Sequence, residues 1–285
     1  MRERRAADGG FYLPYRVPKL SHEELRGLQG MTSAERVLFV ARRFLRLPEK
    51  LFDADGAIIR VSALSSRTAV CEIFPQKSGS FRGFADEIAK RVCPDGLGDA
   101  LWLALSIRIG AVAAAVAEYR PNTCVDISMV SGDLFGPMCA YLAREIGLPV
   151  GDILCCCNEN SGFWELLHHG ELRTDQTAAR SVVPEADVAV PDGLECLIAL
   201  CCGREEVVRY LDAVRSGKTY VPGEEGLDRL RASFRATVVT GPGLLRGAYI
   251  PCGAPVKACT ALALTGLLDY RAATGSGRSA LVIAE

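Results

Sequence analysis

Residues 125–157 read VDISMVSGDLFGPMCAYLAREIGLPVGDILCCC, and this stretch decides the fold. Its pattern predicts a strand over 125–130, a glycine-containing loop over 131–136, a helix with an early proline over 137–146, and a strand over 153–157. A strand, a helix and a second strand in that order predict parallel strands joined by a right-handed crossover. The sequence therefore predicts an α/β fold with a parallel sheet at its core.

The rest of the chain continues this alternation. Ser21 and Glu24 have the spacing of a capping box, and apolar residues over 37–45 extend a helical N-terminal region. Further strands are predicted over 70–74, 237–240 and 280–284, and helices over 81–92, 99–119, 162–169, 193–201, 205–215, 224–234 and 256–271. We expect a helical region over residues 1–60 followed by an α/β domain over residues 61–285.

Composition narrows the classes of partner. The chain has 285 residues, of which 49% are hydrophobic, so it is long enough to bury a substantial core. Its 33 basic and 34 acidic residues leave no charge excess to attract nucleic acid or an anionic membrane. We therefore expect neither nucleic acid nor membrane as a partner, and a small-molecule ligand remains open.

The N-terminus and the longest apolar stretch are the candidates for a targeting segment and a membrane span. Asp8, Gly9 and Gly10 stand where a signal peptide needs an apolar core, so we expect a cytoplasmic protein. Residues 100–117 approach the length of a membrane span, but Arg108 near the middle makes a buried helix the better interpretation.

Twelve cysteines raise the question of disulfides or a metal. A chain of this size without an export signal favours reduced, buried thiols. Cys155, Cys156 and Cys157 follow one another in a predicted strand, where alternate side chains point to opposite faces and cannot converge on one ion. His168 and His169 likewise diverge on a predicted helix. No metal site is expected.

A set of short motifs follows a fixed order along the chain. They are GFYLP at 10–14, VPKLS at 17–21, IFP at 73–75, FRGF at 81–84, GDLFG at 132–136, GLP at 147–149, NEN at 158–160, GEL at 170–172, and SVVP at 181–184 with Asp187 and Val188. In order and spacing they resemble the threonine synthase family over most of the chain, most closely over 131–200. The resemblance implies the large-domain fold of the tryptophan synthase β-like, fold type II pyridoxal-phosphate enzymes.

The resemblance also implies a reaction and a cofactor. The family converts O-phosphohomoserine and water to threonine and phosphate, a lyase step of threonine biosynthesis. Its Phe-Lys-Asp-Phe lysine forms a Schiff base with pyridoxal phosphate, and Arg82 stands at that position here. A guanidinium stays protonated and cannot form the imine. Lys77, five residues earlier, is the local substitute. We expect cofactor binding to be weak or lost.

The predicted phosphate loop departs from the family as well. It comprises Gly132, Asp133, Leu134, Phe135 and Gly136. Such a loop binds phosphate through free backbone N–H groups at a helix N-terminus. Phe135 replaces the family's second glycine, and Asp133 replaces an asparagine and puts a carboxylate beside the phosphate. The alternative interpretation is a tight loop that only joins a strand to a helix.

Other departures point to a reduced protein. Only 23 residues separate Arg82 from Ser106, where the family carries most of its small domain. Leu105 and Arg108 replace two family asparagines, and residues 252–255 replace an Asp-Pro-His-Thr segment. The small domain is therefore expected to be largely deleted.

Asn158, Glu159 and Asn160 follow a predicted buried strand, where open α/β sheets bind their ligands. They are candidates either for substrate contact or for capping of the loop. By contrast, Gly217 and Lys218 echo the end of a P-loop, but a predicted helix precedes them, so we interpret them as a helix stop.

Three functional hypotheses remain open. The first is a degenerate threonine synthase homologue, a pseudoenzyme with a binding or structural role. The second is a working enzyme of altered chemistry, with Lys77 as its reactive amine. The third is an interaction protein, because loss of the small domain would expose apolar surface to a protein partner or a second copy.

Overall fold

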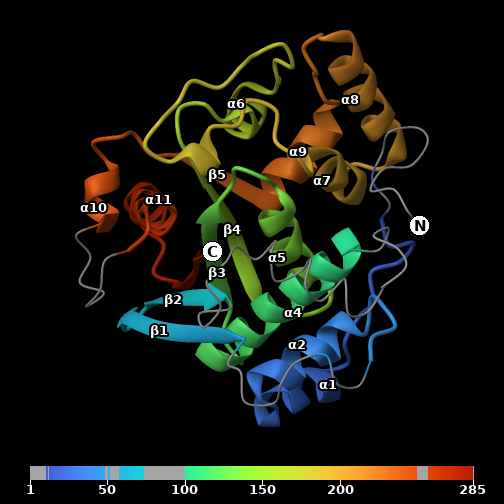
Figure 1. The fold of residues 1–285 in the computed structure, drawn as a ribbon, viewed down its shortest axis with the longest axis vertical. Coiled ribbons are helices and arrows are strands. Elements are labelled where there is room, and N and C mark those ends of the chain that lie inside the picture. The colour runs from blue at the N-terminus through green and yellow to red at the C-terminus, as the bar shows by residue number, and fades with distance from the viewer. Residues whose placement is uncertain are drawn as a thin grey trace. The chain divides into compact units, whose positions relative to one another are not determined.

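The computed structural model describes residues 11, 13–48, 51, 58–73, 100–248 and 256–284. The helices and strands drawn in Figure 1 belong to two compact units. Unit 1 comprises Met1–Val125, Cys139–Gly151 and Ile283–Glu285, and unit 2 comprises Asp126–Met138 and Asp152–Val282. The predicted division at residue 60 stays a prediction.

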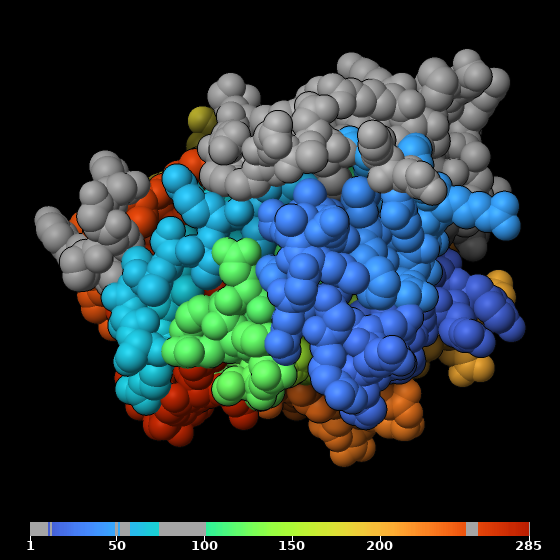
Figure 2. All heavy atoms as spheres, turned by 90° about the horizontal axis from the view of Figure 1, so that it is seen from below, coloured from blue at the N-terminus to red at the C-terminus, as the bar shows by residue number. Residues whose placement is uncertain are grey.

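Short capped helices open unit 1. They are α1 (His22–Gly27), the 3₁₀ turn η1 (Leu28–Gly30) and α2 (Ser33–Ala41), and they lie at the surface in blue in Figure 2. The predicted capping box is confirmed, because Ser21 and Glu24 each accept the other's backbone N–H. A second box, Thr32 with Glu35, was not predicted. It starts a new helix, so the region is two short helices instead of one continuous stretch.

The longest helix of unit 1 is α4 (Ala100–Tyr119). Gly110 lets it approach α2 closely, since an added Cβ would lie 2.5 Å from the Val37 carbonyl oxygen. Within the described residues, Leu101–Tyr119 is the one segment long and apolar enough to cross a membrane, and most of it is buried inside the protein. The interpretation as a buried helix is confirmed.

A hairpin of β1 (Ile59–Ser65) and β2 (Thr68–Ile73) completes unit 1. The two strands pair antiparallel, with Val61 opposite Cys71. The strand predicted over 70–74 overlaps β2, whereas β1 was not predicted. β1 has mostly polar or small side chains at exposed positions, so it lacks the apolar run that marks a buried strand.

Unit 2 is built on β3 (Val125–Val130), β4 (Val150–Cys157), β5 (Phe234–Val238) and β6 (Ser279–Ala284), which lie in the order β6-β3-β4-β5. β4 and β5 are parallel. β3 and β4 are parallel too, because backbone bonds join their starts, Val125 to Pro149, and their ends, Ser131 to Cys156. The predicted strand, helix and strand over 125–157 are confirmed.

The helices of unit 2 are α5 (Phe135–Glu145), which continues into unit 1, α6 (Gly162–His169), η2 (Pro184–Ala186), α7 (Leu194–Cys201), α8 (Arg204–Ser216), α9 (Glu224–Ser233), α10 (Leu244–Ala248) and α11 (Ala258–Thr274). Most match the predicted helices to within a few residues, but α10 was not predicted. Phe234 begins β5, where a helical end was expected. Gly217 ends α8 at φ +62°, which confirms the helix stop.

The cysteine run of β4 lies in the core. Cys155, Cys156 and Cys157 are buried free thiols, as expected. Burial raises the pKa of Cys156 and of Cys157 to about 12, so both thiols are neutral at ordinary pH. An added Cβ on Gly266 of α11 would lie 2.3 Å from the Cys156 sulfur, so the helix packs directly on the strand. Among the described residues, no cluster of three His, Cys, Asp or Glu side chains could hold a metal ion.

Candidate functional site

The loop after β3 is held by bonds to distant parts of unit 2. The Ser131 N–H donates to the Cys156 carbonyl at 3.0 Å, and the Leu134 N–H donates to the Asp192 carbonyl at 2.9 Å. The Phe135 N–H donates to the Asp133 carboxylate at 3.0 Å. Asp133 thus satisfies a backbone donor at the start of α5. This bond accounts for a helix that begins two residues before its predicted start.

The space beside the loop is filled by the chain itself. An added Cβ on Gly132 would lie 1.6 Å from the Glu185 carbonyl oxygen, so glycine is needed here for backbone to pass against backbone. Phe135 lies against Gly193, whose φ is +86° and whose added Cβ would lie 3.1 Å from the phenyl ring. Gly132 and Phe135 of the predicted phosphate loop therefore both have a packing role.

This geometry does not fit a phosphate group. A phosphate needs unoccupied N–H donors at the helix N-terminus. Here the N–H groups of Leu134 and Phe135 already have acceptors, and the second acceptor, Asp133, carries a negative charge that repels an anion. We therefore assign no phosphate contact to this loop.

The side chains after β4 form a hydrogen-bonded network. The buried Asn158 amide donates to the Asp187 carboxylate at 2.6 Å and to the Ser181 hydroxyl at 2.9 Å. The Asn160 amide donates to the same Asp187 oxygen at 3.0 Å and to the Ala179 carbonyl at 2.8 Å. These two amides tie the segment 179–187 to the end of the strand.

The remaining bonds close the network. The Ala179 N–H donates to the Asn160 amide oxygen at 3.0 Å, and the Asn160 N–H donates to the Asn158 amide oxygen at 3.0 Å. Glu159, between the two asparagines, is exposed. Of the two interpretations of the Asn-Glu-Asn segment, its contacts favour loop capping.

Asp187 is the centre of this network. Burial by itself would raise the pKa of Asp187, but hydrogen bonds from Ser181, Asn158 and Asn160 outweigh it and hold the pKa below its ordinary value. The carboxylate is therefore charged and fully engaged. In the sequence, Asp187 stands out only as part of the motif at 181–188. Its hydrogen bond with Asn158 joins residues almost thirty positions apart, so the sequence does not indicate it.

The segment 179–187 connects the two predicted parts of the site. Its Glu185 carbonyl lies against Gly132, and its Asp187 holds Asn158. Leu105 and Arg108 are both buried in α4. Arg82, Lys77 and residues 252–255 lie outside the described residues, so their roles stay predictions.

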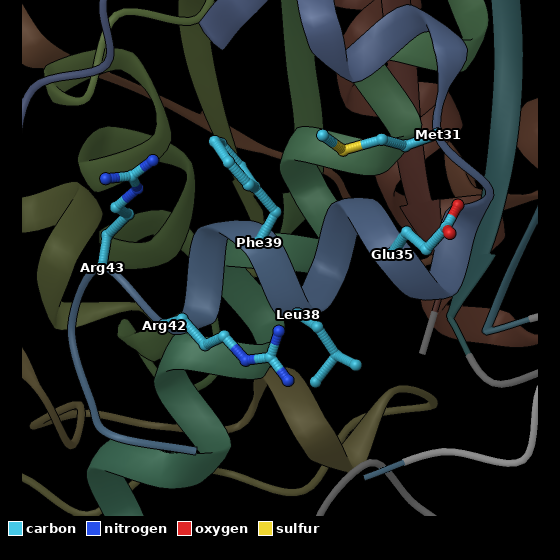
Figure 3. Close-up of a pocket in the computed structure, with 6 residues that line it drawn as sticks. All are labelled: Met31, Glu35, Leu38, Phe39, Arg42 and Arg43. Atoms are coloured by element: carbon cyan, nitrogen blue, oxygen red, sulfur yellow. The ribbon is translucent and has the colours of Figure 1, made fainter. Parts of the chain in front are cut away.

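A separate hollow of about 550 Å³ lies over α2 in unit 1 (Figure 3). Phe39 and Arg43 lie side by side there, with the guanidinium 4.6 Å from the ring centre, and Arg43 also pairs with Glu24 at 2.5 Å. Arg42 donates to the Pro48 carbonyl at 2.6 Å. The two arginines already have partners, and none of the residues lining the hollow was predicted as a site residue.

No protein-family model matches the sequence, and no curated protein matches it significantly. Solved structures do match. A threonine synthase from Brucella melitensis superposes with a TM-score of 0.81 at 17% identity, covering 99% of this chain and 83% of that one. The yeast threonine synthase gives 0.81 at 12% identity, with 98% and 82% covered, and that of Escherichia coli gives 0.72 at 14%, with 98% and 82% covered. The chain therefore has the α/β fold of the threonine synthases.

Proposed function

We propose that this protein is a threonine synthase-like pseudoenzyme that no longer converts O-phosphohomoserine and water to threonine and phosphate. The observation that carries the proposal is the loop after β3. Its Leu134 and Phe135 N–H groups are bonded to Asp192 and Asp133, where a phosphate ligand would need them. Two N–H groups that already have acceptors have little to offer a phosphate.

The identity of residue 82 supports the same conclusion. The Brucella melitensis neighbour is a pyridoxal-phosphate-bound enzyme. Imine formation with that cofactor needs an amine that loses its proton, and Arg82 carries a guanidinium that does not. Lys77 is the nearby amine, and it defines the competing hypothesis of a working enzyme.

The test is to incubate the purified protein with pyridoxal phosphate, reduce with borohydride, and look for a modified lysine by mass spectrometry. We expect no stoichiometric adduct and no phosphate release from O-phosphohomoserine. The matched variant is Lys77→Ala. An adduct with wild type that is absent from Lys77→Ala, together with phosphate release, would replace this proposal with the Lys77 enzyme.

A second variant addresses the loop separately from the lysine. Arg82→Lys restores an amine but leaves Asp133 and Phe135 in place. We expect it to form no tight cofactor complex. Adding Asp133→Asn and Phe135→Gly removes the repelling charge and the bulky ring, so cofactor affinity should rise relative to Arg82→Lys alone. Tight binding by Arg82→Lys alone would show that the loop is not a barrier.

A further inference from the structure

The strand β5 lies at one end of the order β6-β3-β4-β5, so β4 covers one of its edges (Figure 1). The Val239 N–H donates to the Cys157 carbonyl at 2.8 Å, which shows that residue 239 faces β4. Because backbone groups of alternate residues point the same way, Thr237 also faces β4, whereas Ala236 and Val238 point to the opposite edge.

The outer edge is open at these two residues. The backbone groups of Phe234, which precedes them, already have hydrogen-bond partners. Its N–H donates to the Leu230 carbonyl, and its carbonyl accepts from the Arg235 guanidinium at 3.2 Å. Among the described residues, the outward N–H and C=O groups of Ala236 and Val238 have no partner. An unpaired strand edge of this kind is a template for another strand.

A hollow of about 460 Å³ runs beside this edge, lined by β5 together with residues of α6, α9 and α11. Ala236 and Thr237 line it directly. Leu167 and Ala273 provide apolar wall on either side, and Arg231 provides charge. Ala236, one of the two residues with open backbone groups, therefore borders a space with room for side chains.

The charge of the hollow is positive. The Arg231 guanidinium donates to two neutral carbonyls, Leu167 at 2.7 Å and His168 at 3.3 Å, and no carboxylate pairs with it among the described residues. Two other charged residues that line the hollow have partners of opposite charge. Arg235 pairs with Asp152 at 3.3 Å, and Asp269 pairs with Arg246 at 2.7 Å. A carboxylate is the complement that the hollow lacks.

We propose that the outer edge of β5 binds an extended, carboxylate-bearing peptide segment of another protein as an added strand. The peptide backbone bonds to Ala236 and Val238, its carboxylate reaches Arg231, and an apolar neighbour packs between Leu167 and Ala273. A second copy of this chain is disfavoured as the occupant. Two-fold pairing of β5 strands would bring two basic edges together.

The free protein supplies the first test, by amide hydrogen exchange. The N–H groups of Ala236 and Val238 should exchange much faster than those of Thr237 and Val239, which bond to β4. Equal protection of all four would overturn the proposal, because it would mean that the edge is already covered.

The probe is a blocked pentapeptide of sequence TVEVT, tested beside a copy N-methylated at its two valines and a copy with lysine for glutamate. We expect weak binding of the glutamate peptide, with slowed exchange at Ala236 and Val238, and at least tenfold weaker binding of the other two. No binding at about 1 mM, or equal binding of the N-methylated copy, would overturn strand addition.

The protein variants have matched controls. Ala236→Pro removes an outward N–H without removing a bond to β4, so it should fold and lose at least tenfold in peptide affinity. Arg231→Ala should also weaken binding, whereas Arg229→Ala, on the same helix and paired with Glu225, should not. Self-association of the wild type that Ala236→Pro abolishes would identify a second copy as the occupant and overturn the peptide proposal.

Discussion

The guanidinium of Arg278 lies 2.6 Å from the carboxylate of Asp126, whose side chain is 1% exposed. Arg278 immediately precedes β6, and Asp126 is near the start of β3. The next strand, β4, provides Asp152, which Arg278 also contacts at 3.0 Å, and β5 provides Arg235 at 3.3 Å from Asp152. Arg278 thus bridges the two carboxylates of β3 and β4, and Arg235 pairs with the second of them, so ion pairs link the starts of the four strands.

Removing Arg278 should leave the Asp126 carboxylate buried, with the Asp152 N–H as its one remaining hydrogen-bond partner among the described residues. We expect Arg278→Met to destabilise the protein by about 2 kcal/mol, less than for a fully buried pair because Arg278 is 41% exposed. Urea unfolding measures this. Arg60→Met, which breaks an exposed pair with Glu72, should cost less than about 0.5 kcal/mol. Adding Asp126→Asn to Arg278→Met should recover part of the loss, and strict additivity would contradict the pairing.

We expect Tyr220 to make the stability of the folded protein fall at alkaline pH. Burial and the hydrogen bond from its hydroxyl to Glu206, at 2.9 Å, raise the pKa of Tyr220. The folded state therefore holds this proton more tightly than the unfolded state does, so its contribution is complete below about pH 10 and falls as the pH rises further. Tyr220→Phe should flatten the alkaline limb of a stability–pH curve. The same change at the fully exposed Tyr15 should leave the curve unchanged.

Adding a side chain at Gly266 should create a steric conflict within the core. A methyl group there would lie 2.3 Å from the Cys156 sulfur, so Gly266→Ala should cost about 1–3 kcal/mol in thermal or urea unfolding. Cys156→Ala removes the sulfur and should partly rescue the variant. Gly27→Ala, in a helix where an added Cβ meets nothing within 4 Å, should be neutral or stabilising. Failure of the rescue would place the conflict elsewhere.

Much of this architecture could be predicted from sequence because it depends on local patterns. The strand, loop and helix over 125–146 and the stop at Gly217 follow from apolar spacing, proline and glycine. β1 escaped prediction because its side chains are largely exposed. The second capping box at Thr32 follows the same rule as the first and could have been found.

The contacts that occupy the candidate site could not be predicted in the same way. Asp192 and Glu185 reach the loop after β3 from more than fifty residues away, and backbone groups carry both contacts. No sequence motif indicates that a backbone carbonyl will accept a hydrogen bond from the N–H of a distant residue. The engagement of Asn158 with Asp187 is a similar case, since it arises only when the segment 179–187 folds back over the end of β4.

The Asp187 network predicts where the chain opens when a bond is lost. Asp187→Ala removes the acceptor shared by Asn158 and Asn160, so segment 179–187 should detach and trypsin should cleave after the exposed Arg180 several times faster. Glu159→Ala, between the two asparagines but exposed, is the control and should cleave at the wild-type rate.

The same network predicts a dependence on pH. Because the pKa of Asp187 is lowered, the contribution of its carboxylate to holding segment 179–187 should persist on acidification to about pH 3.9 and disappear below that value. Onset of cleavage in wild type well above that pH would show that another group controls the segment.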